Sequence, residues 1–197
     1  MSNELGPKPF RFAKAGAFTS QSVATHFSHH FYIAFMSDET LTDSEEETRS
    51  FLISLPIFDS FNVTELSILS RHMSYVHLKR GEYLFVEGDL GTFMGFVVNG
   101  VIEVFKRAET GENIVLARLA RGSSIGEMAI IDKAPRSATA MAKQPTTMVT
   151  LTEKGFDLLA DKYPETGIKV IKKIARLLSL NMRRTSSKLA DLLQSSP

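Results

Sequence analysis

Residues 125–142 read IGEMAIIDKAPRSATAMA, and the rest of the chain is organised around this stretch. It opens with Gly126-Glu127 and a short apolar run, passes through a polar turn, and reaches Arg136-Ser137-Ala138 before an alternating apolar segment. The guanidinium of Arg136 offers a planar fork of donors that fits two phosphate oxygens at once. The run after Glu127 is long enough for one helical turn, whose free N–H groups also favour an anion.

The neighbouring side chains suggest a sugar beside that phosphate. The carboxylate of Glu127 would repel a phosphate, but it can accept a hydrogen bond from a ribose hydroxyl. Ser137 adds a hydroxyl donor, and the small Ala138 lets a ligand approach its backbone N–H. The alternative is that Glu127 and Arg136 form an ordinary surface salt bridge, worth about 0–1 kcal/mol.

Taken together, the stretch resembles the phosphate-binding cassette of the cyclic nucleotide-binding domain family. Residues 125–130 and 136–142 fill the family pattern: an apolar residue, Gly-Glu, any residue, a small residue, an apolar residue, a short spacer, Arg, a small residue, Ala and an alternating strand. The resemblance covers about residues 55–193 and implies that Glu127 binds the ribose 2′-hydroxyl and Arg136 the cyclic phosphate. The ligand-binding residues expected in the cassette are Gly126, Glu127, Met128, Ala129, Arg136, Ser137 and Ala138.

Composition is typical of a globular protein with one core and extensions. The chain has 197 residues, of which 43% are hydrophobic and 23% charged, and its net charge of +1 favours neither nucleic acid nor membrane. It contains no cysteine, which excludes disulfides, thiolate metal sites and cysteine nucleophiles. This fits a reducing compartment, and we expect a cytoplasmic protein. No apolar run approaches the ~20 residues that span a bilayer, so no membrane partner is expected.

The N-terminal part divides into two expected segments. Residues 1–37 contain three basic residues and no acidic residue after Glu4, which is typical of a transit peptide. Alternatively, translation starts at Met36; in both cases we expect a disordered or non-native extension. Residues 38–55 form an acidic helical segment, in which Ser44 and Glu47 have the spacing of a capping box.

Residues 56–163 are the expected barrel. Asn62 and Glu65 predict a capped helix over residues 63–72. Short apolar or alternating runs separated by glycine turns then indicate about eight strands, at residues 82–86, 93–98, 101–106, 114–119, 139–143 and 148–151 among others. The predicted fold is mainly β with flanking helices: an eight-stranded antiparallel jelly-roll barrel with N-terminal helices and a long C-terminal helix. One departure from the family is Gly95, which predicts looser packing or more room beside the ligand.

Residues 164–197 are expected to form a lid and dimerisation helix, after a shorter helix over residues 152–162 capped by Thr152. Pro164 suits the first turn of the long helix. Its apolar residues form two stripes. A heptad seam contains Ile168, Ile171, Ala175, Leu178, Met182, Thr185, Leu189 and Leu192, and a second stripe contains Val170, Ile174 and Leu177. Two stripes predict one face for the barrel and one for a partner helix, giving a homodimer.

The sequence is compatible with four functional interpretations. We favour a cyclic nucleotide-binding regulatory module that is not an enzyme, binds no metal, and signals to an unidentified effector through movement of its C-terminal helix. A metalloenzyme of the cupin type would need clustered ligands, but only His72 and His77 lie near the barrel. A structural domain with a degenerate pocket is the third interpretation. A transcription-regulator sensor fragment is a further alternative, although no helix-turn-helix segment follows the long helix, so DNA is not an expected partner.

The most detailed prediction concerns the residues that contact the purine base. From Arg136 onward the chain aligns without a gap with the catabolite-activator subfamily, and the positions that meet the purine there fall on Asn181 and Met182. An asparagine amide suits the edge of an adenine, so cAMP is favoured over cGMP as the ligand. The alternative is that Asn181 is solvated or sets the register of a dimer seam.

Overall fold

The computed structural model describes residues 43–194, apart from the side chain of Leu192, so the expected extension at residues 1–37 lies outside the described residues. The elements in chain order are α2 (Asp43–Ile53), η1 (Pro56–Phe58), α3 (Val63–Ser70), β1 (Met73–Leu78), β2 (Tyr83–Phe85), β3 (Phe93–Asn99), β4 (Ile102–Arg107), β5 (Asn113–Leu119), β6 (Ser124–Ile125), α4 (Glu127–Asp132), β7 (Thr139–Ala142), β8 (Thr146–Thr152), α5 (Glu153–Lys162) and α6 (Pro164–Gln194).

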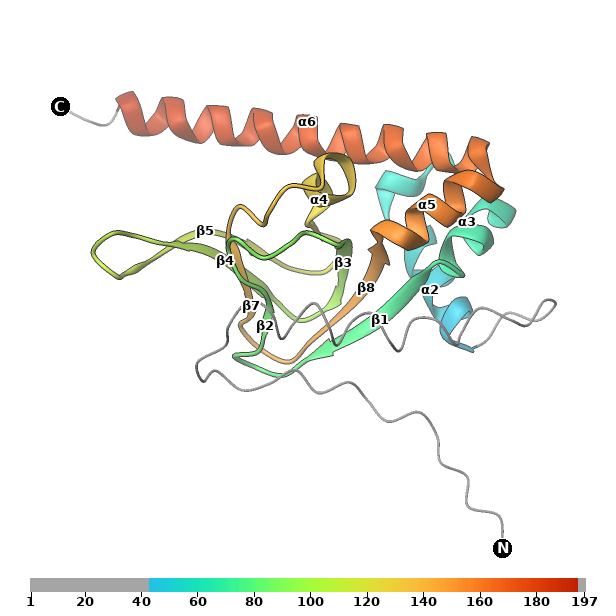
Figure 1. The fold of residues 1–197 in the computed structure, drawn as a ribbon, viewed down its shortest axis with the longest axis horizontal. Helices are drawn as coiled ribbons and strands as arrows, with labels where there is room; N and C mark the ends of the chain where they lie inside the picture. Colours follow the sequence, from blue (N-terminus) through green and yellow to red (C-terminus); the bar gives the residue numbers. More distant parts are fainter. Residues whose placement is uncertain (1–42, 195–197) are drawn as a thin grey trace, which may run out of the picture.

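The strands of the described region form two four-stranded antiparallel sheets, ordered β1-β8-β3-β6 and β2-β7-β4-β5. Helices α2, α3 and α5 gather at one end of these sheets, the β4–β5 hairpin projects at the other, and α6 runs along the top above α4 (Figure 1). This confirms the predicted jelly roll with flanking helices. Strands β1 and β6 were not delimited from the sequence. Strand β6 has only two residues, and β1 lacks a regular apolar alternation.

The two predicted helix starts have different outcomes. At α3 the capping box is present: the Asn62 side chain accepts from the Glu65 N–H, and the Glu65 carboxylate accepts from the Asn62 N–H, both at 2.9 Å. At α2 the prediction was wrong, because Ser44 lies inside the helix and its carbonyl accepts from the Thr48 hydroxyl at 2.8 Å. Three carboxylates in the first turn of α2 stabilise its positive end in place of that box.

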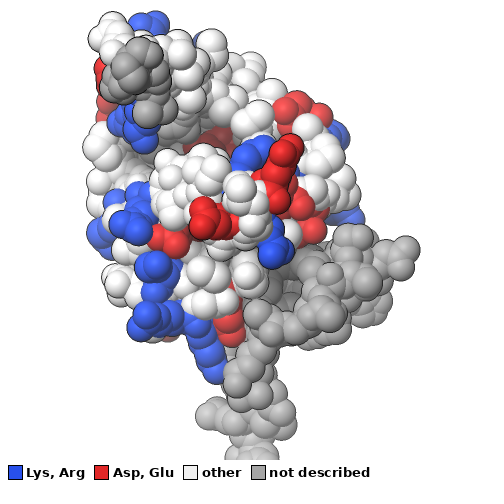
Figure 2. Space-filling view, turned by 90° about the vertical axis from the view of Figure 1, so that its left-hand side faces the viewer, with Lys and Arg blue, Asp and Glu red and all other residues white. Residues whose placement is uncertain are grey.

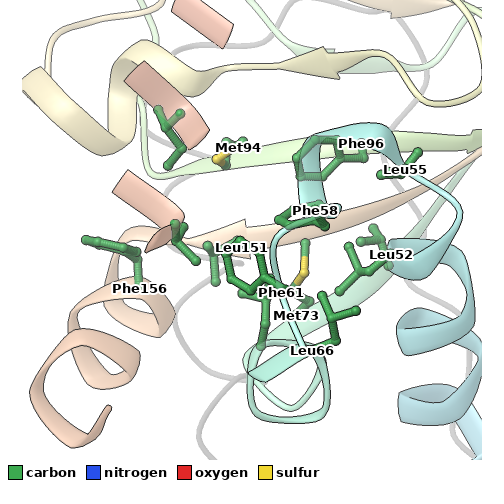
Figure 3. Packing of buried hydrophobic residues seen from close by; sticks show 14 of the residues in the cluster. Leu52, Leu55, Phe58, Phe61, Leu66, Met73, Met94, Phe96, Leu151 and Phe156 are labelled. Atoms are coloured by element: carbon green, nitrogen blue, oxygen red, sulfur yellow. The ribbon is translucent and has the colours of Figure 1, made fainter. Parts of the chain in front are cut away.

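The larger core cluster lies between the helices and the β1-β8-β3 face. Leu52 from α2 and Leu66 from α3 point toward Met94 and Phe96 on β3 and Leu151 on β8 (Figure 3). The same cluster includes residues of α5 and α6. The helices at both ends of the described region therefore share one core with strands β1, β3 and β8 and with Ile130 of α4.

The two stripes of α6 face different surroundings. Val170 and Ile174 are buried in the larger core, at 4% and 2% exposure, whereas Ile168 and Met182 of the heptad seam are 56% and 70% exposed. One stripe therefore covers the body of the domain, as predicted, and the partner for the other stays a prediction. The Lys169 ammonium also contacts the Glu65 carboxylate at 2.6 Å, which anchors the first half of α6 to α3.

Gly95 has a packing reason that the sequence did not reveal. A Cβ at this position would lie 3.0 Å from the Val149 carbonyl oxygen, 3.1 Å from Cγ2 of Thr150 and 3.3 Å from Cε of Met148. These three atoms belong to β8, so the space that a bulky residue would occupy is already filled. The expected looser packing is therefore wrong at this position.

Candidate functional site

The backbone of Arg136 is fixed by the turn between β2 and β3. Its N–H donates to the Asp89 carbonyl at 2.8 Å, and its carbonyl accepts from the Gly88 N–H at 2.9 Å. One residue earlier, Pro135 forms an isolated antiparallel bridge with Leu90. These contacts hold the start of the Arg136 side chain at one place relative to both sheets.

The side chain of Arg136 points inward and is only 5% exposed. Its Nη2 donates to the Phe93 carbonyl at 2.7 Å, and its Nη1 lies 3.4 Å from the Gly126 carbonyl. The guanidinium carbon lies 4.1 Å from the ring centre of Phe85 and 4.6 Å from that of Phe93. The Nε donor is buried and has no partner among the described residues. Two of the five guanidinium N–H donors are therefore engaged, and the Nε–H is among those that remain for another molecule.

No carboxylate of the described residues forms an ion pair with Arg136. The two acidic side chains whose charges act on Arg136 have other partners: Asp89 accepts from the Val86 N–H at 2.9 Å, and Glu127 accepts from the Ser124 hydroxyl. Burial lowers the pKa of Arg136 to about 10, although the charges of Asp89 and Glu127 oppose this shift. The group is therefore still cationic at neutral pH, and its charge is not neutralised by a contacting partner.

Glu127 begins α4 and is 6% exposed. The preceding Gly126 has a left-handed backbone with φ of 82°, and a Cβ there would lie 2.5 Å from Nη1 of Arg136 and 2.9 Å from the Phe93 carbonyl oxygen. Glycine is therefore needed both for the backbone conformation and for the close approach of Arg136. Since Glu127 and Arg136 are both buried and unpaired with each other, the alternative of a surface salt bridge is wrong.

The remaining expected residues of the cassette surround this centre. Ala129 and Ala138 are buried, at 3% and 7% exposure, and Met128 and Ser137 are exposed. The short helix α4 therefore buries Ala129 and presents Met128 to solvent.

Asn181 is exposed on α6, outside the cassette. It follows Val170, Ile174 and Leu177 at spacings of four, three and four residues, so it continues the stripe that faces the domain rather than the heptad seam. Met182 lies about 100° further around the helix, on the seam. The two residues that align with purine contacts therefore face different directions.

Sequence reasoning missed the residues that support the cassette from outside it. Phe85 and Phe93 come from β2 and β3, and no local pattern indicates that their rings enclose an arginine. The Ser124 hydroxyl donates to the Glu127 carboxylate, and this is not a capping box, because Gly126 is the N-cap of α4. No group of three or more possible metal ligands is present among the described residues, and none of the described helices has the length and hydropathy of a membrane span.

Comparison with known proteins agrees with this geometry. Residues 75–163 match the family model described as Cyclic nucleotide-binding domain. The cAMP-dependent protein kinase regulatory subunit of Mycosarcoma maydis is 32% identical over 114 residues, which make up 55% of this chain and 22% of that protein. The Cyclic AMP receptor protein of Thermus thermophilus is 28% identical over 138 residues, which make up 70% of this chain and 62% of that protein. The chain thus spans less than two thirds of each relative.

Among solved structures, a cyclic nucleotide-binding domain from Methylobacillus flagellatus matches with a TM-score of 0.67 and 27% sequence identity, over 75% of this chain and 83% of that one. The matched family model, this structural likeness and the Gly126-Glu127 and Arg136 motif agree with one another. Residues 75–163 therefore form a domain of the cyclic nucleotide-binding family, similar to the domains of catabolite-activator-like proteins.

Proposed function

We propose that this chain binds a cyclic nucleotide, cAMP in preference to cGMP, with the phosphate on Arg136 and the ribose on Glu127. The observation that carries the proposal is the buried guanidinium of Arg136, which has an unpartnered Nε donor and no contacting carboxylate. Phosphate is the ligand that such a donor fork fits best. The backbone N–H of Ala138 and the hydroxyl of Ser137 complete the proposed polar lining, whereas the Ala129 N–H donates to the Gly126 carbonyl at 3.2 Å.

In this proposal Asn181 reads the base. Its place on the domain-facing stripe of α6 supports this role, and Figure 2 shows the surface hollowed between the end of α6 and the barrel. Calorimetric titration with cAMP and cGMP tests it: Asn181→Ala narrows the preference for cAMP by ~1–3 kcal/mol. Leu180→Ala, one residue away on another side of the helix, is the control and leaves the preference unchanged. An unchanged ratio of cAMP affinity to cGMP affinity in Asn181→Ala would show that Asn181 does not contact the base. A wild type that binds neither nucleotide overturns the proposal.

The output is a ligand-dependent shift of α6. The first half of the helix is anchored by Lys169 to Glu65 and by Lys173 to Asp59, at 2.6 and 2.7 Å, whereas residues 179–191 are exposed. Helix α4, which begins with Glu127, contacts α6, so a ligand on the cassette can act on that helix directly. Hydrogen exchange tests this: cAMP slows amide exchange in residues 179–191 and not in residues 165–174. Equal amide exchange of residues 179–191 with and without cAMP would contradict the proposed movement of α6.

The partners follow from the same helix. We propose a cytoplasmic homodimer through the heptad seam, which transmits the ligand signal to an effector protein and has no catalytic activity, metal, membrane or DNA partner of its own. Met182→Lys places a charge on the seam and converts the dimer to a monomer in sedimentation, whereas Arg183→Gln on the basic face does not. A wild type that sediments only as a monomer, with and without cAMP, overturns the dimer.

A further inference from the structure

Two phenylalanine rings enclose the guanidinium of Arg136, and they come from strands outside the cassette. Phe85 belongs to β2 and Phe93 to β3, and their ring centres are 6.1 Å apart at an interplanar angle of 63°. We infer that Phe85 and Phe93 are positioning residues of the phosphate site, which hold Arg136 in place without a carboxylate and occupy none of its N–H donors. This inference rests on the proposed function and adds the residues that prepare Arg136 for its ligand.

The two rings stabilise the positive charge of Arg136, which is costly to bury. A buried cation needs a stabilising neighbour, and the usual neighbour is a carboxylate. A carboxylate would occupy the donors of the fork and would have to be displaced by the incoming phosphate. The face of an aromatic ring attracts a cation through its quadrupole and uses none of the in-plane N–H donors. At 4.1 and 4.6 Å from the guanidinium carbon, both rings are close enough to act in this way.

The in-plane contacts are consistent with the same role. The two terminal nitrogens of Arg136 approach backbone carbonyls of Phe93 and Gly126, which are neutral acceptors, and Nε is left without a partner among the described residues. Because the Phe93 acceptor is a backbone oxygen, any residue at that position supplies it. A substitution of Phe93 therefore removes the ring and keeps the hydrogen bond.

The two rings differ in what else they support, which makes the test sharper. Phe93 is 6% exposed and belongs to the smaller core cluster, so its loss also lowers stability. Phe96 lies on the same strand at 3% exposure but packs in the other cluster, so Phe96→Leu is a matched control for the loss of a buried ring. Phe85 is only partly buried, so its replacement disturbs the core less.

The experiment is calorimetric titration of cAMP into the full chain and four variants, with thermal unfolding of each. Phe85→Leu and Phe93→Leu each weaken binding by about threefold to thirtyfold, as expected for the loss of one cation–π contact. Phe85→Tyr, which keeps the ring, restores most of the affinity. Phe96→Leu lowers the unfolding temperature to the same extent as Phe93→Leu. Its affinity for cAMP, however, equals that of the wild type.

Three results would overturn the inference. Wild-type affinity in both Phe85→Leu and Phe93→Leu would show that the rings do not prepare Arg136. An equal loss in Phe96→Leu would show that any core ring has this effect, and a Phe85→Tyr variant as weak as Phe85→Leu would exclude a role for the ring face. In each of these cases the wild type still binds and the proposed function stands. A wild type that binds no cyclic nucleotide overturns the proposed function, and this inference with it.

Discussion

Two charged side chains are buried to the same degree in this domain, and their surroundings are opposite. Glu103 on β4 is 6% exposed, and its carboxylate accepts from Nε of Arg118 at 2.9 Å and lies 3.4 Å from Nζ of Lys143. Arg136 is 5% exposed and has no ion pair among the described residues. One buried charge is thus neutralised within the fold, and the other is not.

The difference separates a structural charge from a binding charge. The hydrogen bond from Arg118 and the charge of Lys143 lower the pKa of Glu103, so its ionised form stabilises the folded state. Burial lowers the pKa of Arg136, so its ionised form is less favourable in the folded chain than in water. A cost of this kind is retained where a ligand of opposite charge removes it, which is the role we assign to the phosphate.

The largest expected effect is that of Arg136→Met, which removes the charge and keeps much of the volume. Loss of two charge-assisted hydrogen bonds at about 1.5–3 kcal/mol each weakens cAMP binding by about 10²–10⁴-fold. The unliganded variant still folds, because the loss of the hydrogen bonds to the Phe93 and Gly126 carbonyls is offset in part by removal of a buried cation that has no ion pair. Calorimetry and urea unfolding measure the two quantities, and tight binding by Arg136→Met would contradict the assignment.

The reverse pattern is expected for Glu103→Gln. The amide cannot form ion pairs with Arg118 and Lys143, whose side chains are 64% and 50% exposed, so the free energy of unfolding at neutral pH falls by about 1 kcal/mol, whereas cAMP affinity is unchanged. The pKa of Glu103 is lowered in the folded state, so its contribution is present above the unfolded carboxyl pKa of about 4.3 and is lost as the pH falls through the lowered folded value.

Urea unfolding of the wild type and Glu103→Gln at a series of pH values therefore gives two curves that converge in acid. A difference between them that stays constant down to the most acidic pH would mean that the charge of Glu103 is not what stabilises the fold. Glu87→Gln is the control, because its partner Lys106 and its own side chain are about half exposed. It changes stability little at any pH.

The smallest effect is expected for Ser124→Ala. The hydroxyl donates to Glu127 and orients it, so its loss weakens cAMP binding by about threefold, in line with one ordinary hydrogen bond. The affinity for 2′-deoxy-cAMP falls less in this variant, because that ligand lacks the hydroxyl that is proposed to donate a hydrogen bond to Glu127. Equal losses for both ligands would mean that Ser124 acts on the fold and not on the ribose contact.

Motifs formed by residues close together in the chain could be predicted from the sequence, whereas contacts between distant segments could not. The order Gly126, Glu127 and Arg136 is contiguous enough to be read directly, and so are the capping box at Asn62 and the turn glycines. The rings of Phe85 and Phe93 meet Arg136 only after β2, β3 and the cassette loop come together, so no spacing indicates them. For the same reason, the heptad analysis found both stripes of α6 without showing which one faces the core.

The most direct test of the central claim is the Nε–H resonance of Arg136, observed by nitrogen–proton NMR and assigned by its absence in Arg136→Lys. Because Nε has no partner among the described residues, we predict a large shift of this resonance when cAMP is added and none with adenosine, which lacks the phosphate. A domain that is saturated with cAMP while this resonance stays in place would contradict the account.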